Sequence, residues 1–73
     1  MGLADNYLSQ VRPLLEKPYL NPVERAELED VFYQFKEEAE FIFPNLDSGK
    51  PSSAEEAKCL SLLEQMGYKG GII

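Results

Sequence analysis

The sequence has no histidine, and this absence limits the chemistry that the protein can perform. Histidine is the commonest general base and the commonest metal ligand in proteins. The single cysteine, Cys59, falls on the apolar side of a predicted helix and has no histidine to activate it. Two Glu-x-x-Glu spacings begin at Glu24 and Glu37, but these carboxylates lie mostly off the apolar face. We therefore expect no enzymatic activity, no catalytic residue, no metal site and no cofactor.

Disulfide and membrane signals are also missing. One cysteine cannot form an intrachain disulfide, and a lone cysteine is typical of a reducing compartment. No apolar run approaches the ~18 residues of a membrane span. The first residues lack the basic and apolar regions of a signal peptide. We expect a cytoplasmic protein that does not bind membranes.

Basic residues are few. The chain has 7 Lys and Arg against 13 Asp and Glu, a net charge of −6, and the basic residues are scattered from Arg12 to Lys69. Because a nucleic-acid backbone is bound by clustered Lys and Arg, we expect no direct contact with nucleic acid. Residues 22–42 hold seven acidic and two basic side chains, and so carry −5 of this charge. This acidic segment either keeps the protein soluble or meets a basic surface on a partner.

What is present fits one small globular domain. The chain has 73 residues, of which 44% are hydrophobic and 27% charged. Apolar residues recur at helical spacing in three segments, and no segment alternates as a strand does. The sequence predicts an all-α, compact three-helix domain over residues 1–73. The expected helices span about 3–17, 22–42 and 53–66, and a flexible tail follows at 69–73.

Proline, serine and glycine set the expected helix ends. Pro13 lies on the polar side of the first segment, which predicts a kinked helix, with two short helices breaking near Arg12 as the alternative. Asn21 is a good N-cap, and Glu24 can complete its capping box. The second helix should end at Ile42, because the next residue precedes a proline.

The third helix has two candidate starts and one expected end. Ser52 and Ser53 are each followed three residues later by a glutamate, a capping-box pattern. Gly67 is the expected left-handed cap, after which Tyr68 would pack back on Leu63 as in a Schellman motif.

The stretch 32–43 holds all four phenylalanines of the chain. On a helical wheel of residues 22–42, six apolar side chains share one broad arc that should face the core. Tyr33 and Phe41 fall outside this arc, and Phe41 lies nearly opposite its centre. Phe41 is either covered by the following loop near Leu46, or it anchors a partner together with Tyr33. The arc itself, which should face the core, contains Leu28, Val31, Phe32, Phe35, Ala39 and Ile42.

Two isoleucines, Ile72 and Ile73, follow a pair of glycines at the end of the sequence. They either fold back onto the core of the domain or enter a pocket on a partner or a neighbouring copy.

These features predict a small, acidic protein-binding module that acts as an adaptor, regulator or inhibitor of another protein. Two alternatives stay open. One is a nucleic-acid mimic, for example a phage-encoded one, that blocks a DNA- or RNA-binding protein. The other is a self-assembling structural subunit, and hence a homo-oligomer. The candidate protein-binding residues are Tyr33, Glu37, Phe41, Ile72 and Ile73.

Overall fold

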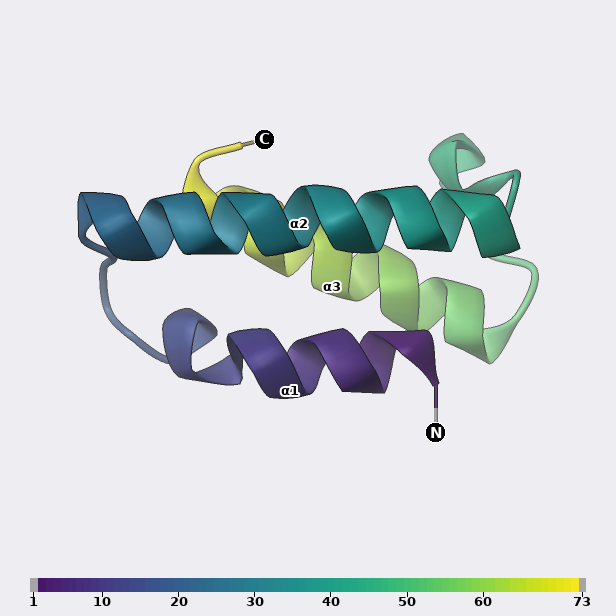
Figure 1. Ribbon diagram of the computed structural model, residues 1–73. Helices are drawn as coiled ribbons and strands as arrows, with labels where there is room; N and C mark the ends of the chain where they lie inside the picture. The colour runs from purple at the N-terminus through teal and green to yellow at the C-terminus, as the bar shows by residue number, and fades with distance from the viewer. Residues whose placement is uncertain (1, 73) are drawn as a thin grey trace.

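The computed structural model describes residues 2–72 and consists of helices joined by short loops (Figure 1). The α-helices are α1 (Leu3–Leu15), α2 (Pro22–Ile42) and α3 (Ala54–Gly70), and a one-turn 3-10 helix, η1 (Leu46–Ser48), follows α2. There is no strand among the described residues. The predicted all-α, three-helix fold is therefore confirmed.

The helix α2 is the longest element, and both other α-helices pack on it. It runs antiparallel to α1, and α3 crosses behind the pair (Figure 1). The side chains between the three helices form one hydrophobic core. Its buried members are Ala4, Tyr7, Val11, Leu20, Leu28, Phe32, Phe35, Ala39, Leu46, Cys59, Leu62, Leu63 and Met66.

The first helix continues through Pro13 without a break. A proline has no N–H to donate to the carbonyl of Ser9, and its ring needs room beside the preceding turn. Pro13 is exposed, so this ring lies on the solvent side, away from the buried Val11. The two-helix alternative is therefore wrong, and the helix ends at Leu15, two residues before the predicted end. A bend at Pro13 stays a prediction.

The ends of α2 are as predicted. The Asn21 side chain accepts a hydrogen bond from the Glu24 N–H at 2.8 Å, and the Glu24 carboxylate accepts one from the Asn21 N–H at 3.2 Å. This reciprocal pair is a complete capping box. At the other end Phe43 leaves the helical conformation directly before Pro44.

Ser53 is the N-cap of α3, and its hydroxyl accepts from the Glu56 N–H at 3.1 Å. The carboxylate of Glu56 accepts from the N–H and hydroxyl of Ser52 instead of from Ser53. Glu55 points to a different helix, where it accepts from the Ala4 N–H at 3.2 Å. The predicted box of Ser52 with Glu55 is therefore wrong, because Glu55 satisfies a free amide at the start of α1.

The predicted end of α3 at Met66 is wrong. The helix continues through the buried Gly67 to Gly70, and Gly71 adopts the left-handed conformation with φ 71°. The N–H of Ile72 donates to the Gly67 carbonyl at 2.8 Å, which is the long bond of a Schellman motif. The motif is present, but four residues later than predicted. Residues 69 and 70 are thus helical and do not belong to a tail.

The later cap changes which side chain packs back. Tyr68 is 70% exposed and does not cover Leu63 as predicted, whereas Ile72 is half-buried against the core. Gly70 lies under this contact, because an added Cβ there would meet Ile72 at 3.3 Å and Leu28 at 3.5 Å. The interpretation that the tail folds back is confirmed for Ile72, and Ile73 lies outside the described residues.

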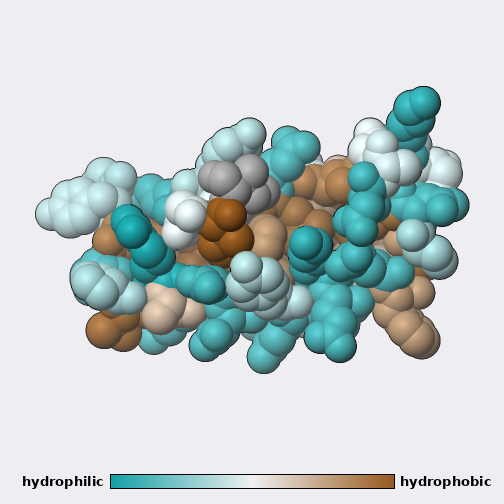
Figure 2. Space-filling view, turned by 90° about the horizontal axis from the view of Figure 1, so that it is seen from above, coloured by the Kyte–Doolittle hydropathy of each residue, from teal (hydrophilic) through white to brown (hydrophobic). Residues whose placement is uncertain are grey.

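Seen from above, hydrophilic side chains cover much of this face of the molecule, and hydrophobic ones show between them (Figure 2). Within residues 2–72 we find no helix with the length and apolar character that crossing a membrane requires.

Candidate protein-binding surface

Phe41 is the most exposed large hydrophobic side chain among the described residues, at 88%. The interpretation that it lies under the loop near Leu46 is wrong, because Leu46 is buried in the core and leaves Phe41 uncovered. The wheel placed Phe41 nearly opposite the core, and the structure confirms that position. An apolar ring is thus held in solvent by a well-formed helix.

Ile42 lies beside this ring and is also exposed, at 53%. It was predicted to face the core, and this prediction is wrong. Ile42 falls at the edge of the core arc on the side of α1, where it lies beside Leu3 and the described residues leave about half of it in solvent. The other five residues of the arc are buried or pack against the core.

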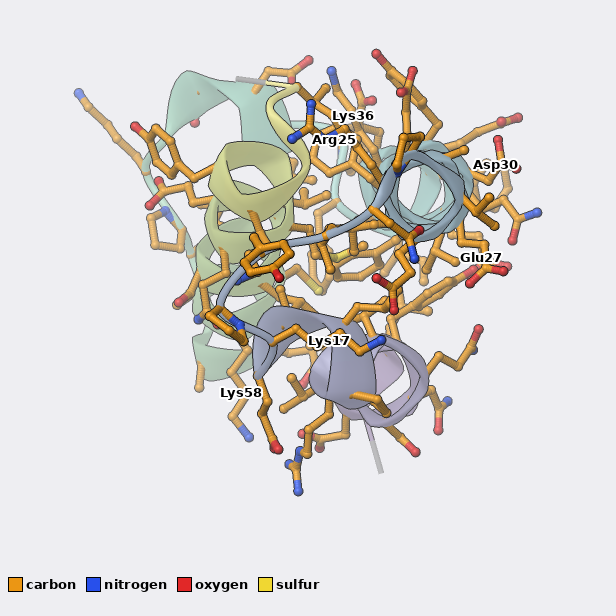
Figure 3. The ribbon with its side chains drawn as sticks, turned by 90° about the vertical axis from the view of Figure 1, so that its left-hand side faces the viewer. Lys17, Arg25, Glu27, Asp30, Lys36 and Lys58 are labelled. Atoms are coloured by element: carbon orange, nitrogen blue, oxygen red, sulfur yellow. The ribbon has the colours of Figure 1, made fainter. Side chains whose placement is uncertain are left out.

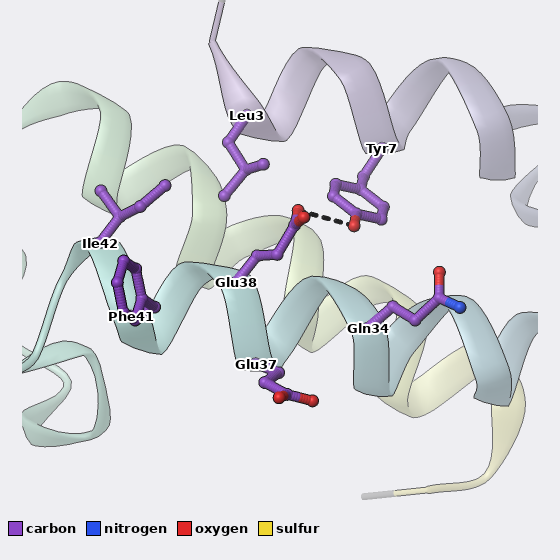
Figure 4. Close-up of a pocket in the computed structure, with 7 residues that line it drawn as sticks. All are labelled: Leu3, Tyr7, Gln34, Glu37, Glu38, Phe41 and Ile42. Atoms are coloured by element: carbon purple, nitrogen blue, oxygen red, sulfur yellow. Dashed lines mark hydrogen bonds between the residues drawn. The ribbon is translucent and has the colours of Figure 1, made fainter.

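A groove with a volume of about 610 Å³ lies between α1 and α2 (Figure 4). We call it the α1–α2 groove. Its apolar end is formed by Leu3 together with Phe41 and Ile42, and two glutamates supply its charge. The residues that line it are Leu3, Tyr7, Gln34, Glu37, Glu38, Phe41 and Ile42.

Tyr7 lies on the inner side of this groove. Its ring is buried and stacks on Phe35, with 4.7 Å between the ring centroids. Its hydroxyl donates a hydrogen bond of 2.7 Å to the Glu38 carboxylate, which reaches across from α2 (Figure 4). Burial raises the pKa of Tyr7 to about 12, and the bond to Glu38 contributes to the rise. At neutral pH Tyr7 is therefore an uncharged donor that holds Glu38 over the groove.

Charge is divided between the two flanks of α2. Glu27 and Asp30 point out on the flank away from α3, whereas Arg25 and Lys36 point toward the C-terminal segment (Figure 3). Among the described residues, the lining of the α1–α2 groove contains two carboxylates and no basic residue. The flank of α2 that carries the groove is therefore acidic from Glu27 to Glu38, whereas nearer the start of α2 Glu24 forms an ion pair with Lys17.

Tyr33 and Ile72 meet in a different place. They line a hollow of about 350 Å³ on the flank of α2 that faces α3, together with Lys36, Leu46 and Leu60. We call this the C-terminal hollow. Tyr33 is 51% exposed and contacts Phe32 edge to face, with 5.3 Å between centroids.

The predicted site residues are thus divided between two surfaces. Glu37 and Phe41 line the α1–α2 groove, and Tyr33 and Ile72 line the C-terminal hollow. Glu37 also lines a shallow depression with Tyr33, so the two surfaces are linked along the outside of α2. Their role in binding stays a prediction.

Sequence reasoning missed the contribution of α1 to the groove. Leu3 and Tyr7 lie opposite Ile42 and Glu38 because the two helices are antiparallel. Both residues belong to the apolar stripe of α1, but a stripe does not show which partner residues it faces.

Cys59 is fully buried, and burial raises the pKa of its thiol, with the nearby Glu55 adding to the effect. The thiol is therefore protonated and packs as a small hydrophobic group. Within residues 2–72 no group of three or more Cys, Asp or Glu side chains is placed to hold a metal ion.

No protein-family model matches the chain, and comparison with curated proteins and with solved structures finds none that is detectably similar.

Proposed function

We propose that this protein is a small cytoplasmic module that binds another protein through the acidic, aromatic side of α2, as an adaptor, regulator or inhibitor. The observation that carries the proposal is the exposure of Phe41 at the open end of a groove. Aromatic residues are enriched among the side chains that dominate binding energy at protein interfaces.

Phe41 differs from an isolated surface hydrophobic residue. Single exposed apolar side chains are normal on soluble proteins. Here Phe41 lies next to the half-exposed Ile42, and both border a concave surface that also contains Leu3. A partner side chain placed there would contact three apolar groups at once, and complete burial of one such side chain is worth about 1.5–3 kcal/mol.

The rim around this apolar end is suited to selectivity. Glu37 and Glu38 are exposed carboxylates on the outer side of the groove. Charged groups at a rim increase the rate of association with a partner of opposite sign and disfavour partners of like sign. Apolar anchoring with an acidic rim is the mechanism that we propose.

The proposal can be tested by a pull-down from the native host, with wild-type protein and three alanine variants as bait at low and at high salt. Phe41→Ala and Tyr33→Ala remove candidate anchors, and Tyr68→Ala is a matched control, since Tyr68 is an exposed aromatic residue outside both surfaces.

We expect a partner that wild type and Tyr68→Ala retain at high salt and Phe41→Ala loses. For the purified pair, Phe41→Ala should weaken binding by about tenfold or more. Recovery of only the protein's own copies, or equal recovery by all variants, would contradict the proposal.

A further inference from the structure

We infer that the α1–α2 groove receives a basic amphipathic helix of the partner protein. Apolar side chains of this helix would contact Leu3, Phe41 and Ile42, and its Lys or Arg side chains would lie beside Glu37 and Glu38. The inference rests on the proposed function and specifies the chemistry of the partner.

The geometry favours a helix as the occupant. The groove is bordered by two antiparallel helices, and α3 packs on them from the other side (Figures 1 and 4). A helix laid into such a groove presents apolar anchors at i, i+3 or i+4, and i+7. With α1, α2 and α3 it would complete a four-helix bundle. The residues of α2 that line the groove run from Gln34 to Ile42, about 12 Å along the helix axis, which is close to the ~10 Å between anchors at i and i+7 of a partner helix.

The charge favours a basic occupant. Within residues 2–72, the charged residues that line the groove are Glu37 and Glu38, and Glu27 and Asp30 continue the acidic flank along α2 (Figure 3). A second copy of this chain carries a net charge of −6 and would bring the same carboxylates together. Nucleic acid would be repelled for the same reason. A cationic protein segment is the occupant whose charge complements this flank.

The Tyr7–Glu38 hydrogen bond prepares the groove for such a segment. It directs the Glu38 carboxylate across the groove, and Glu38 nevertheless remains exposed. One oxygen accepts from Tyr7, so the other can accept from an ammonium or guanidinium group. Because Glu38 is already directed across the groove, less conformational entropy is lost on binding.

The test uses three synthetic peptides and the full isotope-labelled chain. The first peptide is a helix of about 14 residues with leucines at i, i+4 and i+7 and lysines on both flanks. The second has glutamate in place of every lysine, and the third has the composition of the first in scrambled order. Amide chemical shifts report where each peptide binds and how tightly.

We expect the basic peptide to shift the amides of Leu3, Tyr7, Phe41 and Ile42 more than those around the C-terminal hollow. The scrambled peptide should bind about tenfold more weakly, because its leucines no longer share one face. The acidic peptide should not bind.

Glutamate-to-glutamine variants distinguish a direct effect of the groove carboxylates from the effect of the net charge of the protein. The double variant Glu37→Gln/Glu38→Gln should bind the basic peptide about three- to tenfold more weakly than the wild type does. Added salt should reduce this difference in affinity. Glu29→Gln with Glu64→Gln removes the same charge from exposed residues outside the groove lining and should change the affinity by less than about twofold. Glutamine at 38 can still accept from Tyr7, so the fold is kept.

Shifts centred on the C-terminal hollow, or equal binding of the basic and acidic peptides, would overturn the inference. So would groove shifts that depend on protein concentration alone, because they would assign the groove to a second copy. If Phe41→Ala abolishes binding to a partner from the host while the basic peptide does not enter the groove, only the chemistry of the partner is wrong. If the pull-down also fails, the proposed function is wrong as well.

Discussion

The two flanks of α2 differ in how far other segments cover their apolar side chains. The flank that faces α3 is covered and is called the closed flank, and the flank that faces α1 is partly uncovered and is called the open flank. Toward α3, the left-handed Gly71 turns the chain so that Ile72 closes over Gly70, and η1 buries Leu46. Toward α1, no described segment covers the end of the helix, and Phe41 and Ile42 stay in solvent. The closed flank carries Arg25 and Lys36 together with the carboxylates Asp47 and Glu64, whereas both described charged residues of the groove lining on the open flank are carboxylates (Figure 3). The exposed ring of Phe41 thus lies where no described segment covers α2 and beside a groove lining whose described charges are both negative.

The largest expected difference is between two phenylalanines of the same helix. Phe35→Ala should lower the free energy of unfolding by about 3–5 kcal/mol, because Phe35 is fully buried and packs on Tyr7. Phe41→Ala should change it by less than about 0.5 kcal/mol, because Phe41 is exposed. Urea unfolding of both variants measures this. A large loss with Phe41→Ala would mean that its ring is structural and would remove the main argument for a binding surface.

A substitution at Gly71 tests whether its left-handed conformation stabilises the closed flank. Gly71→Ala should cost about 1–2 kcal/mol, because its φ of 71° disfavours any residue with a Cβ. No atom lies within 4 Å of the position of that Cβ, so the cost is conformational and not steric. The chain is short enough for chemical synthesis, and D-alanine at position 71, which favours positive φ, should restore stability in thermal unfolding. Equal losses with both enantiomers would contradict this account of the cap.

Ionisation of Tyr7, which lies on the open flank, should make the stability of the protein depend on pH. Its pKa is raised above the ordinary value of 10 to about 12, so the folded state favours the protonated phenol. Its contribution is complete below about pH 10 and should be lost as the pH rises toward 12. Unfolding measured across this range should show the decline for the wild type. Glu38→Gln should lower the pKa of Tyr7, and an unchanged tyrosinate titration would show that the bond to Glu38 does not contribute.

Tyr7→Phe should lower stability less than Phe35→Ala or Gly71→Ala does. It removes the hydroxyl that bonds to Glu38 and keeps the ring stacked on Phe35, so we expect a loss of about 1 kcal/mol. The decline above pH 10 should disappear with it. A loss equal to that of Phe35→Ala would mean that the substitution disturbs the packing of the core.

Much of the fold could be predicted because it depends on local chemistry. Asn21 with Glu24 and the proline at position 44 set both ends of α2 within a few residues of sequence. The end of α3 could not be read in this way, because Gly67 and Gly71 are both suitable caps. The choice between them depends on the contact of Ile72 with the core, which joins residues that are far apart in the sequence.

The candidate surface could be predicted only where it depends on a single helix. A wheel of one helix was sufficient to place Phe41 outside the core, because it needs only the period of α2. It was not sufficient for Ile42, whose exposure depends on how the first turn of α1 packs beside it. The groove itself requires the register between α1 and α2, and periodicity within one helix carries no information on register.

The most direct test of the account is a photoreactive phenylalanine analogue placed at position 41, and separately at position 68, in the native host. Both positions expose an aromatic side chain, at 88% and 70%, and only position 41 lines the groove. We expect a crosslink from position 41 to one different protein, at a segment rich in lysine or arginine, and no such product from position 68. The same products from both positions, or crosslinks only to further copies of this chain, would contradict it.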